Sequence, residues 1–181
     1  MKKIRLDALM MDIKVPDSVS YVDDGVVDSI GAHENFLNWK RTGDPECLFD
    51  KTKLNDVAGT TYFQKGSGEY RFRIFYLDDS DPNSVICTRG HEETHFVHAV
   101  KRLDNLENEM RTSVGVDINF KNLLKKIDSK NARREIVAEI GGLFAVHRRY
   151  GSEAVKKYSM KYMSEFSHRS NPIYLKALNK L

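Results

Sequence analysis

The clearest hydrophobic pattern in the chain is an alternation within residues 70–77. Phe72 and Ile74 alternate there with arginines, and this period of two is typical of a strand with one buried face. A short β-prone run, 60–63, precedes it, and the glycine-rich stretch 66–68 predicts a turn between two strands. We therefore expect a small sheet in the N-terminal half.

Helical spacing takes over after residue 83. Pro82 breaks the strand pattern, Ser129 is a suitable N-cap for a long helix, and Gly151 is a suitable end for it. Pro172 suits the first turn of a last helix. Helices are predicted at 84–103, 120–127, 131–150, 152–166 and 172–180, whereas 104–116 is polar and poorly periodic.

The N-terminal part of the chain gives a weaker pattern. Asp24 can cap a helix that runs to about Lys40, although its apolar positions fit the helical period only roughly, and 41–58 looks irregular. The chain has no internal repeat and no linker rich in Pro, Gly or Ser. The sum is an α+β fold, a small N-terminal sheet followed by mostly helix, in a single domain over residues 1–181.

Composition narrows the class of protein. The chain is 40% apolar and 30% charged, as in an ordinary globular protein. It has neither a run of ~18 apolar residues for a membrane span nor the apolar stretch of a secretory signal. Cys47 and Cys87 either form one bridge or stay as thiols in a reducing compartment. These features favour a cytoplasmic protein with no membrane association.

Charge is distributed unevenly along the chain. Residues 121–181 hold 14 Lys and Arg against 5 Asp and Glu, whereas residues 1–120 hold 15 against 21. A basic face can attract nucleic acid or an acidic protein, or it can be the solvated outer face of C-terminal helices. No nucleic-acid motif accompanies these cations. The oligomeric state has no signature in the sequence.

The sharpest chemical feature is His91-Glu92-Glu93-Thr94-His95, an HExxH motif. On a helix, residues four apart share one face, so His91 and His95 can converge on one metal ion. Glu92, at the margin of that face, can take a proton from a zinc-bound water as general base. The charge of Glu93 is unusual at its position, so Glu93 must point to solvent or pair with a cation.

A second helix offers further ligands. Glu135 and Glu139 stand four apart within 131–150, and Gly142 continues their face, where it permits close approach of another helix. Their neighbours are largely apolar, and buried glutamates are costly without a cation to neutralise them. Alternatively, both are exposed and pair with nearby arginines.

HExxH followed by ExxxE on a second helix resembles the gluzincin class of metallopeptidases, which have a zincin-like fold. More narrowly, ARREIVAEIG at 132–141 and HEETHFVHAVKRL at 91–103 resemble the metallopeptidase domain of ArdC-type antirestriction proteins and, more weakly, the ImmA/IrrE peptidases. The resemblance covers about residues 88–151. It implies that Glu135 is the third zinc ligand beside His91 and His95, and that Glu139 orients a ligand histidine.

The sequence therefore favours a zinc-dependent hydrolase, an endopeptidase or amidohydrolase that acts on a protein or peptide. The alternative is a catalytically silent zincin-like protein that binds a partner, such as nucleic acid. A structural domain with a chance motif must also treat the Glu135–Glu139 pair as coincidence. One of the tyrosines could stabilise an oxyanion. The histidines and tyrosines without an assigned role are His33, His98, His147, His168, Tyr150, Tyr158, Tyr162 and Tyr174.

Overall fold

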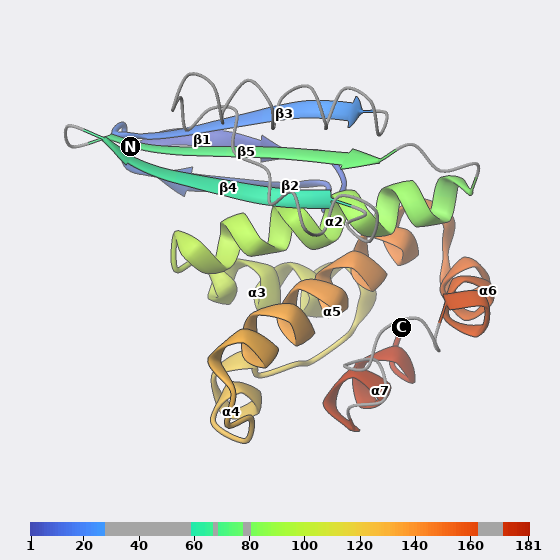
Figure 1. Cartoon of the computed structure of the whole chain (residues 1–181). Helices are drawn as coiled ribbons and strands as arrows, with labels where there is room; N and C mark the ends of the chain where they lie inside the picture. The colour runs from blue at the N-terminus through green and yellow to red at the C-terminus, as the bar shows by residue number, and fades with distance from the viewer. Residues whose placement is uncertain (28–58, 67–68, 78–80, 163–171) are drawn as a thin grey trace.

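A three-stranded mixed sheet lies over one side of helix α2 (Pro82–Ala99), and helix α5 (Lys130–Tyr150) crosses the other side (Figure 1). The structure is a computed structural model and describes residues 1–27, 59–66, 69–77, 81–162 and 172–181. The predicted α+β character is confirmed, with strands in the first half of the chain and helices in the second.

The sheet is built around strand β5 (Glu69–Leu77). β3 (Val19–Val27) pairs with β5 in parallel, and β4 (Gly59–Gly66) pairs with it antiparallel on the other side. The alternation that predicted β5 has the expected consequence, because Phe72 and Ile74 are buried. Phe72 packs edge-on against Phe96 of α2, with ring centroids 4.7 Å apart, so the sheet and α2 share one core.

A separate hairpin precedes this sheet. β1 (Lys2–Leu6) and β2 (Met11–Val15) pair antiparallel, and β2 alternates between buried and exposed positions. The connecting turn includes Met10 at φ 53. No element was predicted here, although Met11, Ile13 and Val15 alternate with charged residues, because the alternation spans only five residues.

The described helices are α2 (Pro82–Ala99), α3 (Leu103–Val114), α4 (Phe120–Leu124), α5 (Lys130–Tyr150), α6 (Ser152–Tyr162) and α7 (Pro172–Leu178). Ser129 caps α5, as predicted, by accepting from the backbone N–H of Ala132. Asp81 caps α2 in the same way, and Pro82 occupies its first turn, so the proline starts this helix. None of the helices among these residues is long and apolar enough to cross a membrane.

Several boundaries differ from the sequence prediction. Residues 24–27 belong to β3 instead of a helix capped by Asp24, because Val26 and Val27 pair with β5, which the local pattern cannot reveal. α2 ends at Ala99, before the expected 103, since Lys101 has a left-handed φ of 57. α4 ends at Leu124, before the expected 127.

The stretch 104–116 was predicted to be poorly periodic, and this was wrong. Most of it forms α3, and its buried residues Leu106 and Met110 stand four apart on one face of the helix.

Several predicted segments fall wholly or partly outside the described residues: the rest of the helix to Lys40, the irregular stretch 41–58, the glycine turn at 67–68 and the end of the helix predicted to 166. Cys47 lies there too, whereas Cys87 is described and is buried.

Candidate metal centre

The predicted site residues come from α2 and α5, which cross at glycines. A Cβ atom added to Gly141 would lie 2.8 Å from the Cβ of Thr94, and one added to Gly142 would lie 2.7 Å from the carbonyl oxygen of Cys87. A Cβ on Gly90 would lie 3.3 Å from the Cα of Gly142. The close approach predicted at Gly142 is therefore confirmed, and two further glycines take part in it. Larger residues at this crossing would push the helices apart.

This crossing places both histidines of the HExxH motif against Glu135. The Nε2 atoms of His91 and His95 lie 3.0 Å apart, and the Glu135 carboxylate oxygens lie 3.3 Å from the first and 3.6 Å from the second. One ligand atom from each residue falls within 4.8 Å of the others, an arrangement that could hold a metal ion. We call these three residues the triad.

Glu139 lies on the side of the His91 ring opposite to the other two triad residues, His95 and Glu135. Its Oε1 is 3.1 Å from His91 Nδ1, and its side chain is 6% exposed, against 44% for Glu135. Glu135 therefore lies at the open side of the cluster, and Glu139 lies behind it. These positions differ from the alternative expectation, in which both glutamates are exposed and pair with arginines.

The electrostatics of the cluster favour a cation. Burial by itself lowers the pKa of His91, but hydrogen bonds to Glu135 and Glu139, with the charges of Glu139 and Glu92, raise it to about 10. Burial by itself raises the pKa of Glu135, but its hydrogen bonds to the two imidazoles hold it well below its usual range. The carboxylates thus stabilise positive charge among these groups.

Glu92 lies next to the triad and is 4% exposed. Successive residues of a helix are rotated by about 100°, which sets Glu92 at the edge of the histidine face and not on it. Its charge nevertheless reaches the His91 ring, since it contributes to the raised pKa described above. Helix geometry therefore sets Glu92 beside the two histidines without placing it on their face.

Of the two environments expected for Glu93, solvent and a paired cation, only the second is found. It does not point to solvent, because its side chain is 0% exposed. It accepts the backbone N–H groups of Ala8 and Leu9 at 3.0 and 2.8 Å, and Arg89 Nε lies 3.4 Å away, so the expected cation is present. Burial raises the pKa of Glu93 to about 7, although the two backbone hydrogen bonds and Arg89 oppose this.

Arg89 extends this contact to two further parts of the fold. Its guanidinium lies 3.0 Å from Asp7 in the β1–β2 turn and 2.5 Å from Asp23 in β3. With Glu93, it joins the hairpin and the sheet to α2 on the side away from the triad. We call Arg89 and Glu93 with these partners the anchor. Sequence reasoning missed the anchor, since its partners lie more than 60 residues away along the chain; the unusual charge of Glu93 was its only signal.

The other histidines and tyrosines are not among the triad ligands. His98 is partly buried on α2, and His147 Nε2 lies 3.0 Å from Ser152 Oγ at the junction of α5 and α6. Tyr158 and Tyr174 are buried, and Tyr150 is 46% exposed. His33 and His168 lie outside the described residues, and so does the side chain of Tyr162.

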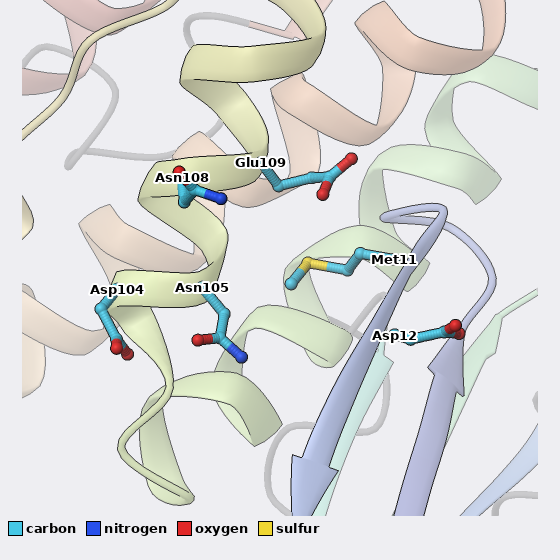
Figure 2. Close-up of a pocket in the computed structure, with 6 residues that line it drawn as sticks. All are labelled: Met11, Asp12, Asp104, Asn105, Asn108 and Glu109. Atoms are coloured by element: carbon cyan, nitrogen blue, oxygen red, sulfur yellow. The ribbon is translucent and has the colours of Figure 1, made fainter.

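A pocket of about 390 Å³ lies between β2 and α3 (Figure 2). Carboxylate and amide side chains form most of its wall, and no residue of the triad belongs to it. Its lining residues are Met11, Asp12, Asp104, Asn105, Asn108 and Glu109.

Models of known protein families, curated proteins and solved structures were all compared with this chain, and none of them matches it.

Proposed function

We propose that this protein is a zinc-dependent hydrolase, most simply an endopeptidase that cleaves a protein or peptide substrate. The observation that carries the proposal is the triad, with Glu139 behind one of its histidines and Glu92 beside it. The sequence resemblance to gluzincins and to the ArdC-type metallopeptidase domain points the same way. That resemblance rests on the motif residues alone.

The triad fits zinc in donor type and in spacing. Two imidazole nitrogens and one carboxylate are a common three-ligand set of catalytic zinc sites. With bonds of ~2.0–2.1 Å, tetrahedral ligand atoms lie about 3.3–3.4 Å apart. The triad separations of 3.0, 3.3 and 3.6 Å scatter around that value. The partly exposed Glu135 leaves one side of the cluster open to a substrate.

Each surrounding residue has a role in this proposal. When bound, zinc would acidify water and polarise a substrate carbonyl group. Glu139 accepts the Nδ1–H of His91, which fixes the ring tautomer and leaves Nε2 free to be a ligand. Glu92 accepts the proton of the attacking water and passes it to the leaving amine, as a general base and then acid.

The alternative, a protein that keeps the triad but has no catalytic activity, loses one of its supports. The unusual charge of Glu93 favoured it, and the anchor now gives that charge a structural reason. Hydrolysis requires a general base such as Glu92, whereas a purely binding site does not.

Two measurements on the purified protein test the proposal. Metal analysis should find about one zinc per chain, which Glu135→Ala should greatly reduce. A broad peptide library, read by mass spectrometry, should give products with wild type that are absent with Glu92→Gln. Identical products from both proteins, or no zinc in the wild type, would contradict the proposal.

A further inference from the structure

The segment that leads into the triad carries an unusual concentration of positive charge. Residues 119–134 cover α4 and the start of α5 and contain six Lys and Arg against one acid, Asp128. Five of the six side chains belong to exposed residues, and we call them the basic patch: Lys121, Lys125, Lys126, Lys130 and Arg134.

The cations of the basic patch lack the ion pairs that five other described cations form. Arg5, Arg89 and Arg148 each lie within ion-pair distance of a carboxylate. Lys156 and Lys161 do so as well. None of the five basic-patch residues forms such a pair with any residue that the structure describes. Their charges are therefore not neutralised within this part of the protein.

The position of these charges is also unfavourable for the helix that carries them. α5 has no acid in its first turn, whereas Lys130 and Arg133 lie there and Arg134 follows them. The N-terminal end of a helix carries partial positive charge, so cations near it destabilise the helix. Helix stability therefore does not explain the basic patch.

One member of the basic patch, Arg134, lies next to the triad. Arg134 directly precedes Glu135, and its charge acts on His98, which lies on α2 one turn after His95. Lys130 is five residues before Glu135, or ~7.5 Å along the helix. An extended peptide covers ~3.3–3.6 Å per residue. A peptide whose bond to be cleaved lies beside Glu135 would thus reach the basic patch roughly two to five residues from that bond.

Resting on the proposed hydrolase function, we propose that the basic patch binds an acidic stretch of the polypeptide substrate, a few residues from the bond held at the triad. A nucleic acid is the less suitable partner. Stacking platforms for unpaired bases need exposed aromatic rings, and the one aromatic residue of 119–134, Phe120, is buried.

The test compares two double substitutions that change net charge equally. Lys126→Glu/Lys130→Glu reverses the centre of the basic patch. Lys3→Glu/Lys157→Glu reverses two exposed lysines elsewhere, on β1 and on α6 beyond the other end of α5. Both are made in the Glu92→Gln background, so that binding is measured without turnover.

The probes are two fluorescent peptide pools of equal length, one containing Glu and Asp and the other Gln and Asn, with a single-stranded oligonucleotide as the third. Anisotropy at ~0.15 M salt should show tighter binding of the acidic pool. The patch variant should lose at least ~10-fold of that preference, while the control variant keeps it.

The proposal is overturned if the two pools bind equally, if both variants lose the preference equally, or if the oligonucleotide binds more tightly than the acidic pool. Zinc content and cleavage, measured on the same protein with Glu92 restored, report on the hydrolase separately. Patch-dependent binding of the acidic pool by a protein that holds no zinc would support the surface and contradict the function.

Discussion

Helix α2 meets carboxylates on two sides, and they are held in two different ways. On the anchor side, Glu93 of α2 is fully buried and meets two backbone N–H groups and Arg89. On the triad side, Glu135 and Glu139 of α5 lie 3.1 to 3.6 Å from imidazole nitrogens of α2, and Glu135 is 44% exposed. Helix α2 thus carries the anchor on one side and the two triad histidines on the other.

This difference offers a way to separate structural acids from candidate metal-site acids. Burial alone does not separate them, because Glu93 and Glu139 are both buried. The partners do: a carboxylate whose hydrogen bonds close within the chain stabilises the fold. A carboxylate that shares a site with histidines invites a metal ion. Substitutions on the anchor side should therefore mainly reduce stability, whereas those on the triad side should mainly reduce zinc binding or turnover.

The largest effect is expected for Glu92→Gln. It keeps the shape of the side chain and removes the proton acceptor, so turnover should fall by ~10²–10⁴-fold. Zinc content should remain about one per chain, measured by metal analysis beside peptide cleavage. Glu93→Gln is the matched control at the next residue, and its turnover per folded molecule should stay near that of wild type. Equal losses in the two variants would break the division between the two sides.

Glu93→Ala should mainly reduce stability. It leaves the N–H groups of Ala8 and Leu9 and the charge of Arg89 without their buried acceptor, which should cost about 3 kcal/mol of unfolding free energy. Urea unfolding followed by circular dichroism measures this. The folded fraction should still bind zinc. A variant as stable as wild type would show that the anchor is not needed.

Glu139→Ala should weaken zinc affinity by ~10–100-fold without abolishing binding, because it removes only the acceptor behind His91. Competition with a chelator gives the affinity. Glu135→Ala, made in parallel, should lose much more. The reverse order would mean that Glu139 is the ligand and Glu135 is the orienting residue.

Gly141→Ala should disturb the crossing on which the triad depends. The new methyl group collides with Thr94, so the variant should lose about 2 kcal/mol of stability and some zinc affinity. Combining it with Thr94→Ala removes two of the three colliding atoms and should restore part of the loss. Additive losses in the double variant would argue against this contact.

The smallest effect is expected for Ser129→Ala, which removes the cap of α5. Loss of an N-cap costs ~1 kcal/mol, read by urea unfolding. Because the cap lies one and a half turns from Glu135, zinc affinity should change little. A large loss of zinc binding would show that the first turn of α5 positions the triad directly.

The sequence predicted the local parts of this protein well. Helix geometry alone puts His91 and His95 on one face, and Glu135 and Glu139 on another, whatever surrounds them. The cap at Ser129 and the alternation over 70–77 are likewise local signals, and α5 and β5 lie where they were expected. The pairing of triad residues was proposed from resemblance to gluzincins, since spacing along the chain does not bring two helices together.

What the sequence could not settle depended on contacts between distant segments. Residues 24–27 joined β5 as a strand because pairing with another strand outweighs a weak helical pattern. Glu93 was open to two interpretations until its partners at Ala8 and Leu9 were known. The glycine crossing decided which faces of α2 and α5 meet. The sequence by itself thus determined which residues share a helix face, because that follows from local backbone geometry, and only the tertiary structure decided which faces meet, because that depends on packing across the whole chain.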